Sequence, residues 1–185
     1  MHEDELISGC ISGSKRHFDY LYETYSYGLY GICLRYSNDE DEAKDLMQEG
    51  FIKLFLQLKT FKSEKGSFEG WMKRIFVNNA IDYYRKKKIT SSIPADQVGE
   101  ELADEREAMP VYDLSQEQLL ELIRNLPQGY RTVFNLYVIE NFSHKEIAAA
   151  LGISESTSKT QFFKARKMLQ EKINQMLIIS NTSDE

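Results

Sequence analysis

The stretch from Phe142 to Arg166, FSHKEIAAALGISESTSKTQFFKAR, limits the possible fold more than any other part of the chain. Ser143 suits the start of a helix, and Glu146 three positions later completes a capping box. Gly152 stands where that helix would end and the backbone needs a left-handed residue. Ser154 can then cap a second helix. Two short helices joined by a tight turn predict a DNA-binding helix-turn-helix, with an ordinary helical hairpin as the alternative.

The second of these helices has two different sides. Its core-facing positions, at helical spacing, are Ser158, Phe162, Ala165 and Leu169. The opposite side carries Ser156, Lys159, Thr160, Phe163 and Lys167. The N-terminal residues of a groove-inserted helix meet base edges, so the candidate readers are Glu155, Ser156, Lys159 and Thr160. The candidate phosphate contacts are Thr157, Lys164, Arg166 and Lys167.

The net charge of −6 is concentrated in one segment. Residues 1–89 are neutral, residues 90–112 carry six acids and one base, and residues 113–185 have a net charge of −1. The acidic segment also contains Pro94 and Pro110, and its apolar residues do not recur at a regular spacing. These features predict a flexible linker. We therefore expect a first domain over 1–89, a linker over 90–112 and a second domain over 113–185.

The composition favours an all-α fold, because 11 Tyr and 10 Phe stand against only 3 Pro and 10 Gly. The expected architecture is two small helical domains, the C-terminal one containing the helix-turn-helix. Cys10 and Cys33 follow no metal spacing, and Cys33 lies in an apolar run typical of a buried thiol. Without a signal peptide or a long apolar run, the sequence indicates a cytoplasmic protein with no metal, cofactor or stable membrane insertion.

The first domain opens with residues 1–14, which are polar and predict a loose start. Apolar spacing then predicts a helix from Lys15 to near Ser37, and Asn38 can cap the next helix. The buried stripe of that next helix is expected to contain Ala43, Met47, Phe51, Leu54 and Leu58. Its other side carries Asp45, Gln48 and Glu49, which form one polar patch. The pattern alone predicts a solvated surface here.

A loop over residues 59–67 contains Lys59, Lys62 and Lys65, and Ser67 can cap a helix from Phe68 to about Lys88. One side of this helix carries Trp71, Ile75, Asn78, Asp82 and Arg85, and its end adds Lys86, Lys87 and Lys88. Aromatic and basic groups together suit a single nucleic-acid strand. A core tryptophan and a lysine run that offsets the helix dipole explain the pattern equally well.

The second domain is expected to open with an apolar helix. Its predicted core positions are Leu114, Leu119, Leu122, Ile123 and Leu126. Pro127 starts the next helix, which is buried through Val133, Phe134, Leu136 and Tyr137. Ala148 and Ala149 should allow the helices of the helix-turn-helix to cross closely. The last helix should continue through Leu177, before a polar tail over residues 180–185.

Several of these stretches together resemble an RNA polymerase sigma factor of the extracytoplasmic-function type, from about Phe18 to Ile173. In the first domain the similar stretches are Asp45-Leu46-Met47-Gln48-Glu49-Gly50-Phe51, Gly66-Ser67-Phe68-x-x-Trp71 and Ile75-x-x-Asn78-x-Ala80-Ile81-Asp82-x-x-Arg85. In the second they are Leu126-Pro127, Glu146-Ile147-Ala148, Leu151-Gly152-Ile153-Ser154 and Lys164-Ala165-Arg166.

The resemblance implies partners and roles. RNA polymerase core would bind Asp45, Gln48 and Glu49. Promoter DNA at the minus-ten element would meet the loop over 59–67 and the helix with Trp71, Asn78, Arg85, Lys86 and Lys87. The minus-thirty-five element would meet the second helix of the helix-turn-helix. Factors of this type are commonly held inactive by an anti-sigma protein, and no residue here identifies one.

Three positions depart from the family pattern: Ser158 replaces a branched aliphatic residue, Gln161 an arginine and Phe163 a polar residue. The alternative function is a freestanding helix-turn-helix regulator of duplex DNA, which has no need of the helix over 68–88. A third class, an enzyme, is disfavoured. His2, His17 and His144 are not at metal-ligand spacing, and there is no glycine-rich phosphate loop.

Overall fold

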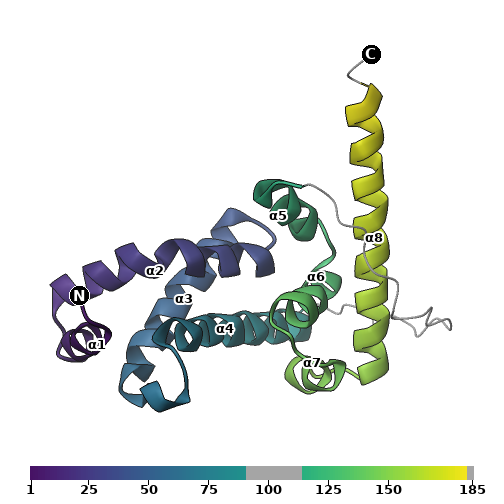
Figure 1. Cartoon of the computed structure of the whole chain (residues 1–185). Helices are drawn as coiled ribbons and strands as arrows, with labels where there is room; N and C mark the ends of the chain where they lie inside the picture. Colours follow the sequence, from purple (N-terminus) through teal and green to yellow (C-terminus); the bar gives the residue numbers. More distant parts are fainter. Residues whose placement is uncertain (91–113, 183–185) are drawn as a thin grey trace. The chain divides into compact units, whose positions relative to one another are not determined.

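The computed structural model describes residues 1–90 and 114–182, and these are helical without strands (Figure 1). The predicted acidic linker lies outside the described residues, apart from Thr90. The chain divides into two compact units, Met1–Tyr83 and Tyr84–Glu185, and the division falls within the fourth helix. Among the described residues, no helix combines the length and apolarity that crossing a bilayer requires.

The first unit begins with a helix that the sequence did not predict. Residues 1–14 contain α1 (Glu3–Ile11), and they are therefore not a loose start. Leu6 and Cys10 are only 2% and 3% exposed. A Cβ on Gly9 would meet the His17 ring at 2.2 Å, so α1 lies close against the following helix at that point. A short apolar period at Leu6, Gly9 and Cys10 is enough to dock this helix.

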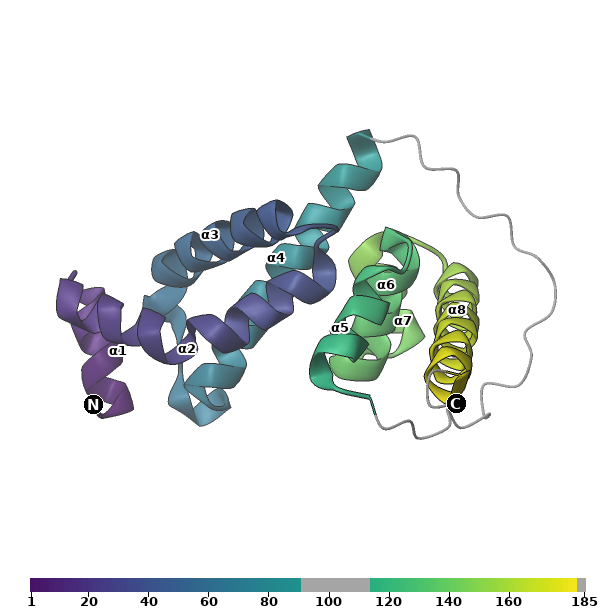
Figure 2. The same cartoon turned by 90° about the horizontal axis from the view of Figure 1, so that it is seen from above.

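The next two helices, α2 (Lys15–Tyr36) and α3 (Glu40–Gln57), pack along each other (Figure 2). The predicted buried stripe of α3 is confirmed at all five positions, from Ala43 to Leu58. The cap of α3 is Asp39 rather than Asn38. The Asp39 carboxylate accepts from the Glu42 amide at 2.8 Å, while Asn38 donates to the Glu42 side chain. Cys33 is buried as predicted, and burial raises the pKa of its thiol to about 12.

Two short 3₁₀ turns, η1 (Leu58–Thr60) and η2 (Ser63–Lys65), lead into α4 (Phe68–Thr90). The predicted cap is confirmed, because the Gly70 amide donates to Ser67 Oγ at 3.1 Å. The buried Asn79 amide donates to the Leu46 carbonyl at 3.0 Å and ties α4 to α3. Ile75 is buried rather than part of a continuous surface stripe. For Lys88, only the backbone is described.

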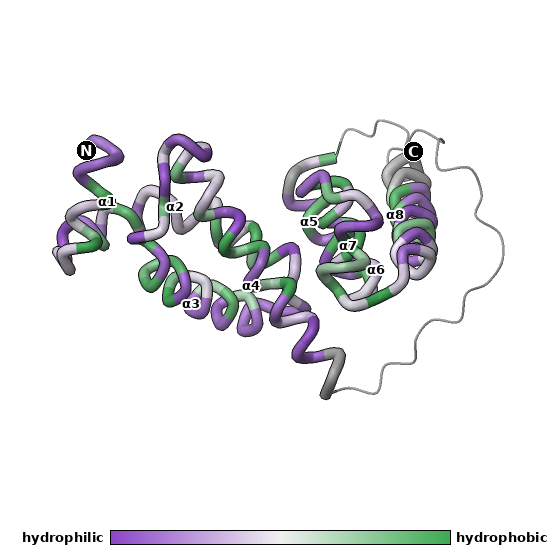
Figure 3. The backbone as a smooth tube through the Cα atoms, turned by 90° about the horizontal axis from the view of Figure 1, so that it is seen from below, coloured by the Kyte–Doolittle hydropathy of each residue, from purple (hydrophilic) through white to green (hydrophobic). Residues whose placement is uncertain are grey.

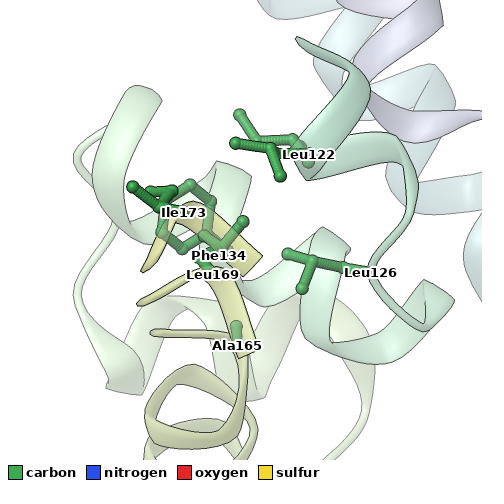
Figure 4. Packing of buried hydrophobic residues seen from close by; sticks show 7 residues of the cluster. Leu122, Leu126, Phe134, Ala165, Leu169 and Ile173 are labelled. Atoms are coloured by element: carbon green, nitrogen blue, oxygen red, sulfur yellow. The ribbon is translucent and has the colours of Figure 1, made fainter. Parts of the chain in front are cut away.

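The second unit contains α5 (Gln116–Arg124), α6 (Gln128–Phe134), the π-helical η3 (Asn135–Ile139), α7 (His144–Leu151) and α8 (Glu155–Thr182). Its core joins α5, α6 and α8 through Leu122, Ile123, Leu126, Phe134, Ala165, Leu169 and Ile173 (Figure 4). The half-buried Leu114 packs against this core, as predicted, whereas Leu119 is 45% exposed and does not belong to it. α8 continues to Thr182, through the start of the predicted tail. Hydropathy changes repeatedly along the helices of both units, as amphipathic packing requires (Figure 3).

Candidate nucleic-acid interface

The helix-turn-helix forms where the sequence predicts it. Ser143 Oγ accepts from the Glu146 amide, and the Ser143 amide donates to the Glu146 carboxylate at 2.8 Å. Ser143 Oγ also donates to the Glu146 carboxylate at 2.7 Å, and this bond, together with that from the Ser143 amide, holds the pKa of Glu146 below its usual value. Gly152 has a φ of 63°, the left-handed conformation that ends α7. The Thr157 amide donates to Ser154 Oγ at 3.0 Å, which confirms the second cap.

A buried polar pair joins the two helices of this motif. His144 Nδ1 lies 2.9 Å from Ser158 Oγ, and the two residues are 7% and 0% exposed. The Tyr137 ring stacks on the His144 ring, with centroids 4.4 Å apart. The buried hydroxyl of Ser158 therefore has a polar partner in His144. Ala149 is exposed, so close crossing of the helices does not depend on it.

The side of α8 away from the core carries the predicted base readers. Ser156 is exposed, and Lys159 and Thr160 are half-buried. The Lys159 ammonium lies 3.5 Å from the Glu155 carboxylate one turn earlier, which orients the lysine along the helix. The inward positions are confirmed, because Ser158, Ala165 and Leu169 are buried and Phe162 is half-buried. The structure thus brings these three candidates together on one accessible side.

The predicted phosphate contacts are less uniform. Lys167 is exposed, while Thr157, Lys164 and Arg166 are half-buried. The Lys164 ammonium lies 5.7 Å from the Tyr130 ring centroid, and the Arg166 guanidinium lies 5.9 Å from that of Phe162. Both cations are therefore steadied by aromatic rings of their own unit, an arrangement that stabilises a cation over a ring face.

In the first unit, Lys59, Lys62 and Lys65 are all exposed on the loop before α4. The half-buried Phe61 ring anchors this loop by packing on Phe68, with centroids 5.2 Å apart. Gly66 ends the loop with a φ of 139°, a conformation that other residues rarely adopt. Three lysines are thus exposed to solvent on a loop that is anchored by the packing of Phe61 on Phe68.

The helix that follows supports parts of both interpretations that the sequence left open. Trp71 is half-buried and packs on Phe61 and Phe68, with ring centroids 5.4 and 5.7 Å away. Asn78, Arg85 and Lys86 are exposed, and Lys87 is half-buried. Asp82 forms an ion pair of 2.8 Å with Lys53 of α3 and so braces the helix. Trp71 belongs partly to the core, whereas the polar positions of this side are accessible.

The predicted patch on α3 is also accessible, since Asp45, Gln48 and Glu49 are all exposed. Near it, burial and a hydrogen bond to the Glu42 carboxylate raise the pKa of the Tyr83 hydroxyl to about 12. This bond joins α4 to the first turn of α3. The polar patch therefore rests on a helix that is fixed at its start.

Sequence reasoning missed that this side of α3 continues as an apolar surface. Ile52 and Leu56 are 52% and 79% exposed, and helical spacing places them in line with Asp45 and Glu49. Ile52 also lines a groove of about 730 Å³ between α2 and α3, together with aromatic side chains that include Tyr22, Tyr27, Phe51 and Phe55. Apolar residues outside the buried stripe were the available signal for this surface.

The geometry defines a class of protein: a two-unit helical protein with a helix-turn-helix in one unit and exposed lysines beside an aromatic-lined helix in the other. Two family models match the chain, Sigma-70 region 2 over residues 21–89 and Sigma-70, region 4 over residues 116–169. The chain belongs to the extracytoplasmic-function sigma factors of RNA polymerase.

Curated relatives match over nearly their whole length. The ECF RNA polymerase sigma factor SigW of Bacillus subtilis is 30% identical over 175 residues, covering 89% of this chain and 92% of SigW. SigM of the same organism is 29% identical, over 84% and 94% of the two chains. The sigma-H factor of Pseudomonas aeruginosa is 26% identical over 95% of each chain. Among solved structures, the sigma factor RpoE in complex with the anti-sigma factor NepR from Bartonella quintana matches 85% of this chain and 96% of its own, at 22% identity and a TM-score of 0.48.

Family membership settles the class of function. A sigma factor binds RNA polymerase core and directs transcription initiation at promoters, and it is not an enzyme. The freestanding regulator is not favoured, because the family match includes the region before the linker as well as the helix-turn-helix.

Proposed function

We propose that this sigma factor docks on polymerase core through Asp45, Gln48 and Glu49. The observation that carries the proposal is their shared exposure on α3, whose opposite side is packed in the core of the unit. Two carboxylates and an amide offer acceptors to basic groups, and the adjacent Ile52 and Leu56 offer apolar area. Such a mixed surface suits a stable protein partner.

The loop and α4 are proposed to handle the opened minus-ten strand. Lys59, Lys62 and Lys65 would hold phosphates beside a base placed in the loop. Asn78, Arg85, Lys86 and Lys87 would continue this contact along α4, and Trp71 supports the loop through its packing on Phe61. Lysines beside anchored aromatic rings are the combination that binds single strands.

The second unit is proposed to read the minus-thirty-five duplex with α8. Ser156, Lys159 and Thr160 would meet base edges, because they lie near the start of the helix and away from its core side. Thr157, Lys164, Arg166 and Lys167 would hold phosphates. The domain assignment that follows is 1–89 for core and minus-ten binding and 113–185 for minus-thirty-five binding.

We also propose that the protein works in the cytoplasm, where polymerase and promoter DNA are found, and that an anti-sigma protein controls it. The exposed side of α3 supports this second partner. A protein that covered Ile52 and Leu56 would also block Asp45 and Glu49, and would therefore exclude polymerase.

Run-off transcription with purified core tests the proposed function. Core should initiate from this protein's promoters only when the chain is added. Asp45→Lys with Glu49→Lys should abolish core binding in a titration, while the free energy of unfolding changes by less than about 0.5 kcal/mol because both sites are exposed. Glu23→Lys with Glu171→Lys is the matched control, since it makes the same charge change at exposed positions outside the patch. Equal core affinity for the two double variants would remove the docking assignment.

A further inference from the structure

Phe163 is an aromatic side chain in an unexpected place. It is 37% exposed, and no other large apolar side chain among the described part of α8 is that exposed. Its neighbour Phe162 turns toward the core and packs on Tyr137, with ring centroids 4.5 Å apart. The folding of this unit therefore packs one of the two adjacent rings against the core and leaves part of the other accessible for a different contact.

The position of Phe163 on the helix places it among the proposed base readers. It lies three residues beyond Thr160 and four beyond Lys159, so these side chains are neighbours on one side of α8. With a rise of about 1.5 Å per residue, Phe163 lies about 4.5 Å along the axis from Thr160. That distance exceeds one base-pair step of about 3.4 Å, so Phe163 and Thr160 can meet different base pairs.

Chemistry then limits what Phe163 can recognise. A phenyl ring neither donates nor accepts a conventional hydrogen bond, so it cannot satisfy the polar edges of guanine, adenine or cytosine. The major groove offers one apolar group on its base edges, the C5-methyl of thymine, and phenylalanine is among the side chains that contact it. Burying both surfaces removes apolar area from water and favours that base.

We propose that Phe163 is a specificity-determining residue that selects a thymine in the minus-thirty-five element through its methyl group. The proposal rests on the proposed function, because it requires α8 to lie in the major groove. It goes beyond that function by naming the chemical group that is read.

The test uses holoenzyme, formed from core and the full chain, and a duplex library randomised over the minus-thirty-five element. The library is amplified once with dTTP and once with dUTP, which differ only in the methyl group. Bound duplexes are sequenced for the wild type, Phe163→Ala, Phe163→Leu, Lys159→Ala and the control Glu171→Ala, an exposed position of α8 outside the proposed DNA contacts. Uracil outside the element affects all variants alike, so comparing variants isolates the contribution of Phe163.

The wild type should prefer thymine at one position about three- to fivefold more strongly than uracil, the value of one buried methyl group. Phe163→Ala should lose that difference, Phe163→Leu should keep part of it, and Glu171→Ala should keep all of it. An equal thymine-over-uracil preference in the wild type and Phe163→Ala would overturn the proposal. If Lys159→Ala also leaves every base preference unchanged, the placement of α8 in the groove is wrong too. If Lys159→Ala relaxes one preference, only the role of Phe163 is wrong.

Discussion

At the scale of single residues, Ser158 and His144 show how one departure from a family pattern is accommodated. A buried hydroxyl needs a hydrogen-bond partner, and His144 provides one from the start of the neighbouring helix. The rings of Tyr137 and Phe162 enclose the histidine, with centroids 4.4 and 5.7 Å away. The pair therefore fixes α7 against α8 by a directional bond as well as by packing.

Ser158→Ala should lower the stability of the second unit by about 1–3 kcal/mol, because it removes the partner of a buried imidazole nitrogen. His144→Leu with Ser158→Val should cost less, since both polar groups are then absent. Urea unfolding can distinguish the two units. Trp71 is the one tryptophan, so its fluorescence follows unfolding of the first unit, while circular dichroism follows unfolding of both. A larger loss in the double variant than in Ser158→Ala would contradict this account.

Lys159 and Lys164 should behave differently when each is replaced by alanine. Lys159 can donate to guanine N7 and O6, so its loss should cost about 1–3 kcal/mol and relax preference at one base pair. Lys164 lies beside the Tyr130 ring, and its loss should weaken all sequences equally and reduce the salt dependence of binding. The affinity of holoenzyme for a set of minus-thirty-five variants, measured at several salt concentrations, gives both the base preference and the salt dependence. A uniform loss for Lys159→Ala would make it a phosphate contact.

At the scale of elements, α1 is the main addition that the structure makes. Three acidic residues fill its first turn, where carboxylates stabilise the positive helix end, and Leu6 and Cys10 supply its buried side. Nine residues are too few for a stable isolated helix. α1 therefore depends on contact with α2, which explains why its own sequence gave so weak a signal.

Leu6→Ala should destabilise the first unit by about 2–5 kcal/mol, the usual cost of deleting a fully buried leucine side chain. Trp71 fluorescence during urea unfolding measures this change. Ile11→Ala serves as the control on the same helix, because Ile11 is 41% exposed and should cost far less. Similar small losses for both variants would mean that α1 is not an integral part of the unit.

At the scale of the whole molecule, the negative charge is concentrated in the segment between the two helical regions. The two helical regions are nearly neutral, and residues 90–112 carry a net charge of −5. Carboxylates at this density can imitate the charge of RNA, so the segment suits a basic channel of polymerase as well as a solvated tether.

Replacing Glu100, Glu101 and Glu105 by glutamine and Asp104 by asparagine should leave both unfolding transitions in place. The ratio of abortive to full-length transcripts should change, because the segment would no longer compete with RNA for basic groups. Neutralising four exposed acids elsewhere, Glu5, Glu23, Glu121 and Glu171, controls for net charge. Unchanged transcript yields in the linker variant would leave only the tether role.

The sequence by itself determined the helix-turn-helix and the helical class. Capping boxes, the left-handed Gly152 and the apolar stripe of α3 are signals that act within one or two turns, so they can be read without knowing the fold. The same locality made Asp45, Gln48, Glu49 and the α8 readers identifiable as accessible side chains. Their binding roles remain predictions, because exposure does not identify a partner.

Only the tertiary structure decided which surfaces are covered. Helical spacing cannot tell that Ile75 is buried while Ile52 and Leu56 are exposed, since each outcome depends on the element packed beside it. The His144–Ser158 bond joins residues 14 positions apart, and its geometry exists only after α7 and α8 cross.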